Sequence, residues 1–357
     1  MPDYVRYSAE IETVAPDERS TIDGLKEQFG HILDATLADY GRGVRAVHAK
    51  AHGIACGTLS VVEGLPRELA QGLFAAPGRY DAVMRFSTNP GDILDDAISV
   101  PRGLAMKVME VDGERLPGSE RDTTQDFVMA NAPAFVARDA SQFLSSLKLL
   151  AKTTDRVEGG KKLLSAALRG VEAGLEAVGL ESATLKTMGA APQVHPLGET
   201  YFSQTAYRYG DHVAKFQVRP VAPALLALRD ERIDTKGRPD AIREDVDAAL
   251  TAHGGAWELR VQLATDPDAM PVEDATVAWD EEASPYRTVA LIEIPIQPGW
   301  GERQRALDEA LAFSPWHGLA AHRPLGNINR ARRESYRYSA DRRREANGCP
   351  LHEPLGI

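Results

Sequence analysis

The amino-acid sequence predicts an α+β fold, and three observations support this class. Short segments in which apolar and polar residues alternate recur along the chain, which is typical of strands joined by turns. Stretches with apolar residues three or four positions apart are grouped near the two ends and in one insertion, which indicates helices outside a sheet. No repeat or low-complexity linker interrupts the 357 residues, so we expect a single domain over residues 1–357.

An N-terminal helical arm is expected within residues 1–40. Residues 20–38 carry apolar side chains at helical spacing, and Ser20 and Thr21 are candidate N-caps. Such a stripe predicts a helix that buries one face against the rest of the domain. Its members are Ile22, Leu25, Phe29, Ile32, Leu33 and Leu37.

Strand patterns begin after this arm. Residues 44–62 contain two glycines among small and β-branched residues, which predicts a strand with bulges or a close backbone approach. Residues 81–88 alternate, so that Arg85 and Ser87 share one face of a predicted strand. Further strands are predicted at 103–111, at 201–218 with a turn at 210–211, at 257–264 and at 286–297.

The other helical stretches lie between and after these strands. An insertion at 141–192 holds two leucine-rich amphipathic segments, and a strongly basic segment of helical period lies within residues 324–357. The predicted helices cover residues 141–151, 160–178, 239–253, 302–312 and 327–347.

Composition excludes several classes of protein. The formal net charge of -11 argues against a general affinity for nucleic acid or anionic lipid. No apolar run reaches the roughly 18 residues of a membrane span, and the polar N-terminus does not resemble a secretory signal. The two cysteines, Cys56 and Cys349, are far apart, so no disulfide framework is expected and the cytoplasm is the predicted compartment.

Two segments in the first hundred residues contain candidate ligand-binding side chains. His48 and His52 are four residues apart, but no further ligand stands at the spacing of a zinc site, so structural roles are the simpler interpretation. Arg85 and Ser87 lie on one face of a strand. If that face is buried, the guanidinium needs an anionic partner, which is either an acidic cofactor group or a carboxylate of the protein.

A third candidate lies in the basic C-terminal helix. Arg332 and Tyr336 are four residues apart, so they share one face of that helix. A guanidinium favours the ionised form of a nearby phenol, and a phenolate is a ligand for ferric iron. The alternative is a solvated basic helix or an RNA-binding tail, which the acidic composition and the missing aromatic platform disfavour.

Five segments, in order along the chain, resemble motifs of the catalase superfamily. The R-A-V-H-A-K of residues 45–50 is similar to the family's R-V-V-H-A-K, and residues 85–88 match its R-F-S-T. The P-R-G-L-A-M-K of residues 101–107 is similar to P-R-G-F-A-V-K, and residues 131–139 follow N-T-P-x-F-F-I-R-D. Residues 332–336 match R-x-x-x-Y. The short chain resembles the compact branch that includes small catalase-like peroxidases and coral-type allene oxide synthases.

The resemblance implies an antiparallel β-barrel of the catalase type, with surrounding helices and a buried haem b. Tyr336 is then the axial ligand of the haem iron, and Arg332 is the partner of its phenolate. Arg45 and Arg85 match arginines that pair with the haem propionates. Phe143 matches a phenylalanine that lines the distal side of the haem.

Catalytic roles are implied in the same way. His48 matches the distal acid–base, and Ser87 matches the residue that holds its imidazole by a hydrogen bond. Asn131 stands in the family's pair of asparagines, but strict alignment puts Ala130 at the position of the distal amide. Val136 replaces the second aromatic residue of the family's F-F. Either Asn131 supplies the amide after a small backbone shift, or the distal amide is missing.

The implied function is haem-dependent peroxide chemistry. The leading interpretation is a peroxidase or weak catalase that acts on hydrogen peroxide or an organic hydroperoxide, with a small-molecule electron donor. An allene oxide synthase-like isomerase or lyase of fatty-acid hydroperoxides is one alternative, and a haem-binding or sensing protein without turnover is another. The fold does not decide among them. The resemblance also leaves open whether the chain forms a homo-oligomer and whether it binds NADPH.

Overall fold

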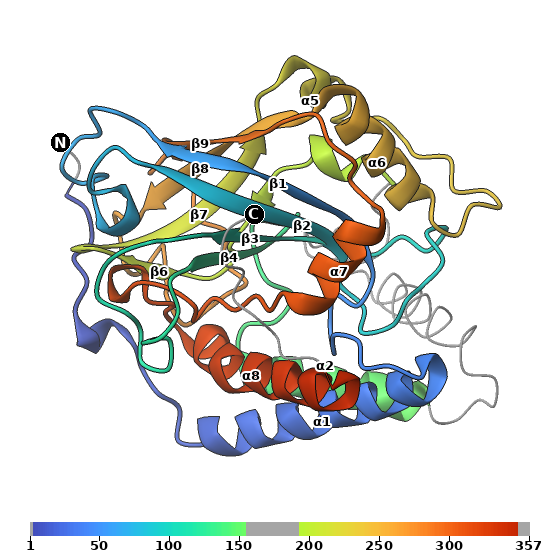
Figure 1. The fold of residues 1–357 in the computed structure, drawn as a ribbon. Helices are drawn as coiled ribbons and strands as arrows, with labels where there is room; N and C mark the ends of the chain where they lie inside the picture. The colour runs from blue at the N-terminus through green and yellow to red at the C-terminus, as the bar shows by residue number, and fades with distance from the viewer. Residues whose placement is uncertain (1–2, 155–192, 349–357) are drawn as a thin grey trace.

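The computed structural model describes residues 3–154 and 193–348. Within these residues, antiparallel strands form one sheet in the order β5-β4-β3-β2-β1-β9-β8-β7-β6 (Figure 1). A further pairing of β5 with β7 joins the two sides of the sheet, so the strands other than β6 close into a barrel. The strands are β1 (Ala51–Val61), β2 (Arg79–Thr88), β3 (Arg102–Val108), β4 (Gln125–Ala130), β5 (Tyr201–Phe202), β6 (Tyr207–Tyr209), β7 (His212–Pro220), β8 (Gly255–Leu263) and β9 (Arg287–Ile294).

The α+β class and the antiparallel barrel are both confirmed. The turn predicted at 210–211 joins β6 to β7. Strand β4 has no counterpart in the predicted pattern, because its six residues begin with the buried polar pair Gln125 and Asp126 and show no simple alternation of polarity. Residues 44–50 lie outside β1 and form a loop that leads to it, so the predicted strand is too long at its start.

Strand β1 shows both features that its glycines predict. Its pairing with β2 is irregular between Ala51 and Gly53. A Cβ atom on Gly57 would lie 2.1 Å from the carbonyl oxygen of Glu293, so a glycine is needed for β9 to approach β1 this closely.

Apolar and aromatic side chains fill the interior of the barrel. Met84 and Phe86 of β2 belong to this core, where the Phe86 ring lies 6.2 Å from that of Trp257. Successive side chains of a strand point in opposite directions. Arg85 and Ser87 therefore lie on the outer face of the barrel wall, which confirms that they share a face.

Helices cover the outside of the barrel. Helix α1 begins at Glu18, so the predicted caps Ser20 and Thr21 are wrong and lie inside its first turn; the Ser20 hydroxyl donates to the carbonyl oxygen of Asp17. The helix predicted at 160–178 lies outside the described residues. The described helices are α1 (Glu18–Tyr40), α2 (Ala140–Thr154), α5 (Pro223–Ala227), α6 (Ala241–His253), α7 (Glu302–Ala310) and α8 (Asn327–Asn347).

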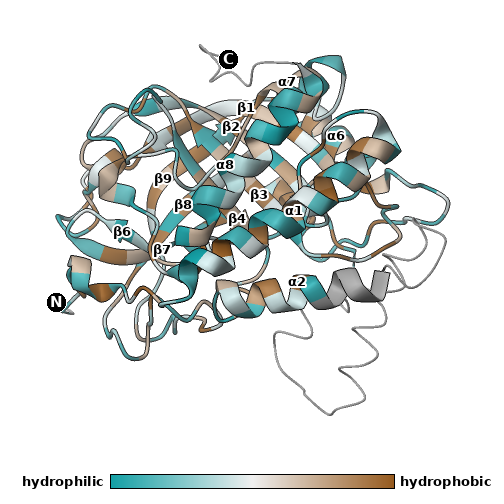
Figure 2. Cartoon of the chain, turned by 90° about the horizontal axis from the view of Figure 1, so that it is seen from below, coloured by the Kyte–Doolittle hydropathy of each residue, from teal (hydrophilic) through white to brown (hydrophobic). Residues whose placement is uncertain are grey.

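Helices α1, α2 and α8 form a layer along one side of the barrel (Figure 1). Seen from below, α8 and α1 run side by side and turn largely hydrophilic faces towards the viewer (Figure 2). Their inner faces meet in an apolar cluster that includes Phe29 and Leu33 of α1, Leu144 of α2 and Ile328 of α8. This burial holds α8, with Arg332 and Tyr336, beside the barrel wall. No helix in the described part of the chain is long and apolar enough to cross a membrane.

Candidate functional site

A pocket lies between the outer face of the barrel and helix α8. Strands β2, β3 and β4 contribute part of its wall, the loop before β1 contributes His48, and α8 contributes Tyr336. The pocket contains about 750 Å³ of space free of protein atoms, counting its opening to solvent. Its apolar lining includes Phe29, Val47, Leu104, Ala105, Val128, Met129, Ala312, Phe313 and Ala340, and its polar lining consists of Arg45, His48, Arg85, Ser87, Ser335, Tyr336, Ser339 and Arg343.

The imidazole of His48 is fixed against the outer face of the sheet. Its Nδ1 lies 3.1 Å from the hydroxyl oxygen of Ser87. A Cβ atom on Gly103 would lie 2.4 Å from the Cε1 atom of the ring, so only glycine leaves room for the ring at this point of β3. The backbone of His48 has a φ of 57°, a left-handed conformation that costs energy for a residue with a side chain. Three local features thus place one imidazole in the pocket.

The imidazole of His48 is neutral at pH 7. Burial, together with the positive charges of Arg85 and Arg332, lowers its pKa to about 3. The Ser87 hydroxyl donates to the carbonyl oxygen of Gly103 at 3.4 Å, so its oxygen accepts a hydrogen bond from Nδ1 of His48. With the ring proton on Nδ1, the free lone pair of the imidazole is on Nε2.

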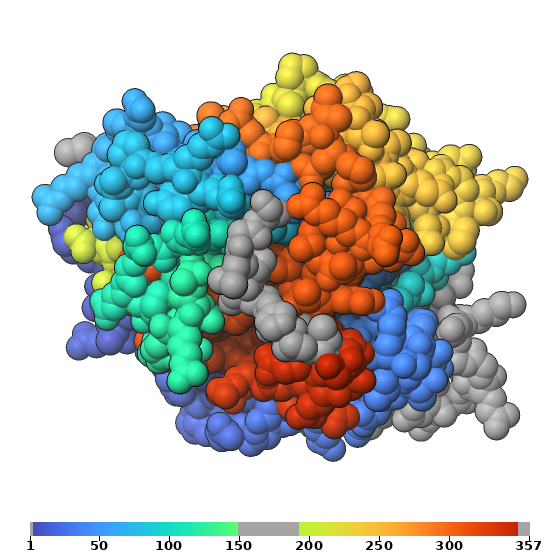
Figure 3. Space-filling view, in the orientation of Figure 1, coloured from blue at the N-terminus to red at the C-terminus, as the bar shows by residue number. Residues whose placement is uncertain are grey.

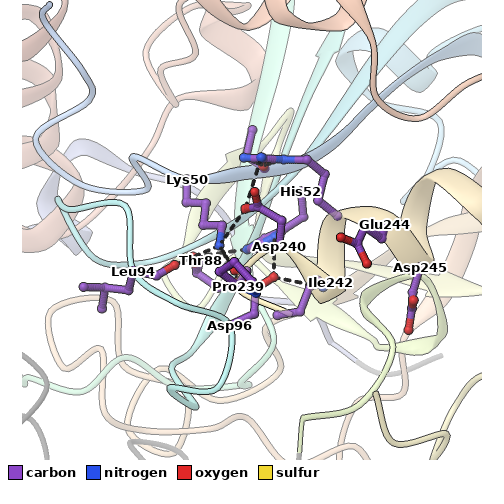
Figure 4. A network of polar contacts seen from close by, with 12 residues as sticks. Lys50, His52, Thr88, Leu94, Asp96, Pro239, Asp240, Ile242, Glu244 and Asp245 are labelled. Carbon is purple, nitrogen blue, oxygen red and sulfur yellow. Dashed lines mark hydrogen bonds and ion pairs between the residues drawn. The ribbon is translucent and has the colours of Figure 1, made fainter. Parts of the chain in front are cut away.

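His52 belongs to a separate, closed polar network (Figure 4). Its Nε2 lies 3.2 Å from Oγ1 of Thr88, and its Nδ1 lies 4.0 Å from Oδ2 of Asp96. Lys50 extends this network through an ion pair with Asp96 at 2.7 Å. His52 is fully buried and does not line the pocket, so it does not pair with His48. In the described part of the chain, no three His, Cys, Asp or Glu side chains are grouped as metal ligands.

Helix α8 presents Tyr336 to the pocket, and Arg332 lies one turn earlier on the same helix. Arg332 Nη1 donates to Oδ1 of Asn329 at 3.2 Å and to Oγ1 of Thr205 at 3.4 Å. The guanidinium also lies 5.6 Å from the centre of the Phe135 ring. These contacts hold the guanidinium of Arg332 one helical turn before Tyr336 on α8.

Three arginines that line the pocket converge on the end of α7. Arg45 Nη1 donates to Oδ1 of Asp308 at 2.7 Å, and Arg85 Nε donates to the same oxygen at 2.6 Å. Arg343 Nη2 donates to a main-chain carbonyl oxygen beside them at 2.6 Å. Arg45 and Arg85 are the arginines that the resemblance brings together, whereas Arg343 has no predicted role. Its position seven residues after Tyr336, two turns along the same face of α8, is the signal that reveals it.

Two residues with predicted roles lie away from the pocket lining. Asn131 Oδ1 accepts from the backbone N–H of Arg102 at 3.0 Å, and its Nδ2 donates to Oε1 of Glu199 at 2.8 Å. Its amide therefore links the start of β3 to Glu199. The ring of Phe143 lies 5.3 Å from that of Phe135, within the apolar cluster of α1, α2 and α8. Neither Asn131 nor Phe143 lines the pocket.

Apolar side chains without a predicted role line the pocket instead. Val128 comes from β4, Phe29 from α1 and Phe313 from the segment after α7. No sequence motif predicts that these residues line a pocket. The sequence identifies Phe29 only as one apolar residue of the predicted N-terminal helix. Their place depends on how distant segments pack against the barrel wall.

Comparisons with known proteins agree with this architecture. The family model described as Catalase matches residues 42–317. No curated protein sequence is significantly similar to the chain. Among solved structures, a fungal catalase has 19% identity and a TM-score of 0.60 over 88% of this chain and 63% of that chain. Catalase A from Saccharomyces cerevisiae has 18% identity and a TM-score of 0.60 over 100% and 68% of the two chains. A bacterial catalase has 18% identity and a TM-score of 0.60 over 90% and 62%.

These likenesses in structure concern the fold, and the chain spans less than two thirds of the length of the fungal and bacterial enzymes. The family match is broader evidence, because it covers most of the chain and includes the segments that carry His48, Arg85 and Gly103. The protein belongs to the catalase family.

Proposed function

We propose that the protein binds one haem b in this pocket through Tyr336 and uses it for peroxide chemistry, as a peroxidase or a weak catalase. The observation that carries the proposal is the convergence of three features in one pocket: a tyrosine on α8, a neutral imidazole held by Ser87, and an arginine cluster. They correspond to an iron ligand, a proton acceptor and a site for carboxylates. Membership of the catalase family supports the same chemistry.

The residues of the pocket fit haem b. The flat apolar ring system suits a lining that includes Phe29, Leu104 and Phe313. The two propionates suit the arginine cluster, in which Arg45 and Arg85 share the carboxylate of Asp308 and Arg343 donates to the carbonyl oxygen of Leu311. A tyrosine phenolate is a haem ligand characteristic of catalases, and Tyr336 is the tyrosine of this lining.

Haem iron, when bound, supplies the electrons and the coordination site for cleavage of a peroxide O–O bond. The role of His48 is to move a proton: its Nε2 takes the proton from one peroxide oxygen and returns it to the other, departing oxygen. A pKa of about 3 favours the return, because the imidazole holds the proton only briefly. Ser87 keeps the ring in the tautomer that accepts at Nε2.

The lining favours an organic hydroperoxide over rapid dismutation of hydrogen peroxide. Dismutation requires a second small peroxide to be held in a fixed orientation, and a hydrogen-bonding amide serves that purpose. The amide of Asn131 is engaged with Arg102 and Glu199, and Val128 adds an apolar side chain to the distal wall. A larger apolar hydroperoxide gains contacts with such a wall, and an external electron donor then completes a peroxidase cycle.

The same apolar lining favours a second candidate function, the isomerisation or cleavage of a fatty-acid hydroperoxide. That reaction consumes no external electrons, whereas a peroxidase cycle does. Steady-state turnover of the haem-loaded protein on hydrogen peroxide and on a lipid hydroperoxide, each with and without an aromatic electron donor, separates the two. Donor-independent consumption of the lipid hydroperoxide supports the isomerase or lyase, and donor-dependent consumption supports the peroxidase.

Removal of one oxygen atom tests the proposed iron ligand. The purified protein is expected to bind one haem per chain with a high-spin ferric spectrum. Tyr336→Phe should lose haem or bind it far more weakly, because the phenolate that would bind the iron is removed. Tyr338→Phe makes the same change two residues further along α8. Tyr338 packs against the apolar cluster of α1, α2 and α8, so this variant should leave the haem content unchanged. Unchanged haem content and spectrum in Tyr336→Phe would contradict the assignment.

A further inference from the structure

The C-terminal end of α7 supplies several acceptors to the arginine cluster. The Asp308 carboxylate accepts from Arg45 and Arg85, and the Asp308 carbonyl oxygen accepts from Arg45 Nη2 at 2.7 Å. The carbonyl oxygen of Leu311 accepts from Arg45 Nη2 at 3.0 Å and from Arg343 Nη2 at 2.6 Å. In the space-filling view the orange residues of α7 and the red residues of α8 lie next to each other on one face (Figure 3). These contacts join α7, α8 and the barrel wall around one group of charges.

This group carries more positive than negative charge. Asp308 forms ion pairs with Arg45 and Arg85, and no other carboxylate of the described residues forms an ion pair with Arg45, Arg85 or Arg343. Three guanidinium groups and one carboxylate leave a net charge of +2, from 3 - 1. In addition, Nε of Arg343 is buried without a hydrogen-bond partner among the described residues.

The buried setting makes this imbalance energetically significant. Burial lowers the pKa of the Arg343 guanidinium to about 10, and burial together with the charges of Arg343 and Arg85 lowers the pKa of Arg45. Burial acts to raise the pKa of Asp308, but Arg45 and Arg85 outweigh it and hold that pKa below its ordinary value. The carboxylate therefore stays ionised. Two buried positive charges remain without an anionic partner, so binding of an anionic ligand would stabilise them.

We propose that Asp308 is a positioning residue for the cofactor: it sets the net charge of the arginine cluster at +2, which the two propionates of one haem neutralise. The inference rests on the proposed haem function. Asp308 lies outside the pocket lining and outside the five family motifs, on a helix that carries none of the predicted site residues. Its carboxylate and the nearby main-chain carbonyl groups orient Arg45 and Arg85 and reduce the repulsion among three like charges.

Haem and haem dimethyl ester, in which both propionates are neutral, provide the test. The readout is the ratio of their dissociation constants, measured by absorbance titration of the full-length chain. Asp308→Asn raises the cluster to +3 and should increase the preference for haem by roughly tenfold or more, because the added charge attracts two nearby carboxylates. Asp308→Glu retains the charge and should keep the wild-type ratio.

Glu309 provides a matched control on the next residue of α7. Its side chain is exposed and forms an ion pair with Arg42 at 3.0 Å, and its charge acts on Arg343 without forming an ion pair with it. Glu309→Gln removes the same charge as Asp308→Asn from the same helix, and it should change the ratio much less, because solvent screens an exposed charge. An Asp308→Asn ratio equal to that of Glu309→Gln would overturn the inference.

A double variant keeps the test valid if Asp308→Asn alone does not fold. Arg45→Gln lowers the cluster to +1 and should reduce the preference for haem over its ester, whereas the double variant Asp308→Asn/Arg45→Gln returns it to +2 and should restore the wild-type ratio. Equal ratios in Arg45→Gln and the double variant would show that Asp308 does not set the charge.

A wild-type chain that binds no haem would overturn the proposed function instead. Equal binding of haem and ester by the wild type would overturn this inference alone.

Discussion

At the scale of single residues, the position of the His48 ring depends on a residue that has no side chain. Gly103 lies on β3, directly against the imidazole, and any Cβ atom there would occupy the space of the ring. The left-handed backbone of His48 adds a second constraint, since such strain persists only where the surrounding structure enforces it. The glycine of the P-R-G motif thus has a physical reason in this fold.

Gly103→Ala is expected to displace the His48 ring and to slow peroxide turnover, while the proposed haem is retained, because Tyr336 is unchanged. The measurement is steady-state turnover normalised to haem content. In a His48→Ala background the same Gly103→Ala change should have little further effect on turnover, because no ring remains to be displaced. A loss of equal size in both backgrounds would show that Gly103 acts through something other than His48.

The two histidines of the first motif should differ sharply in function. His48→Ala is expected to keep the haem and to slow peroxide cleavage by roughly 10²–10⁴-fold, the usual effect of removing a placed acid–base. His52→Ala should instead lower the free energy of unfolding, because the ring is fully buried and bonded to Thr88. Turnover per haem and urea unfolding measure the two effects. If His52→Ala were the slow variant and His48→Ala the unstable one, the assignment of the distal histidine would be reversed.

At the scale of elements, strand β4 determines which side chains this part of the barrel wall presents to the pocket. Phe127 and Met129 belong to the barrel core, so Val128 and Ala130 share the outer face by the alternation of strand side chains. Asn131 follows the end of the strand, where its amide is bonded to β3 and to Glu199. An amide at position 130 would therefore lie on the outer face of the barrel, whereas the amide at position 131 forms hydrogen bonds within the protein.

Two variants at the end of β4 should have opposite consequences. Ala130→Asn adds an amide on the outer face and is expected to raise oxygen release from hydrogen peroxide relative to peroxidase turnover, because a hydrogen bond orients the second peroxide. Asn131→Ala should leave that balance unchanged and should lower stability by about 1–3 kcal/mol, because Glu199 loses a donor. Oxygen electrode and urea unfolding data measure the two effects. A dedicated catalase rate in the wild type would contradict the view that the distal amide is missing.

At the scale of the whole molecule, buried histidines make stability depend on pH. Burial lowers the pKa of His48 and of His322 to about 3, and it lowers the pKa of His52 well below its ordinary value. Below about pH 6.5 the unfolded chain binds protons that the folded chain does not. The free energy of unfolding therefore decreases as the pH is lowered. At pH 5 His48 and His322 each lower the free energy of unfolding by about 2 kcal/mol relative to pH 7.

Urea unfolding at pH 7 and pH 5 should therefore show a markedly lower stability at pH 5. His322 Nε2 accepts from the backbone N–H of Leu73, and His322→Gln keeps an acceptor there while removing the titrating ring. This variant should lose less stability on acidification than the wild type. His31→Gln changes an exposed histidine on α1 and is the control, which should behave as the wild type. Equal pH dependence in all three proteins would show that His322 is not held neutral by burial.

Much of this protein is determined by short-range pattern in its sequence. Periodicity alone predicts helix α8 with both of its bounds, Asn327 and Asn347, and places Arg85 and Ser87 on one face of a strand. Such features depend on backbone geometry and on polarity within ten or twenty residues, and both can be read directly from the order of the residues. The motifs around His48 and Tyr336 are equally local, and they led to the family that the comparisons confirm.

Only the tertiary structure decided which side chains share the pocket. Arg343 and Asp308 lie 35 residues apart in the sequence, and they meet because α7 and α8 pack against the same part of the barrel wall. The packing of α1 against α8 places Phe29 in the lining, whereas Asn131 and Phe143 lie outside it. Contacts between distant segments depend on the shape and burial of every element between them, whereas a motif describes only the residues within it.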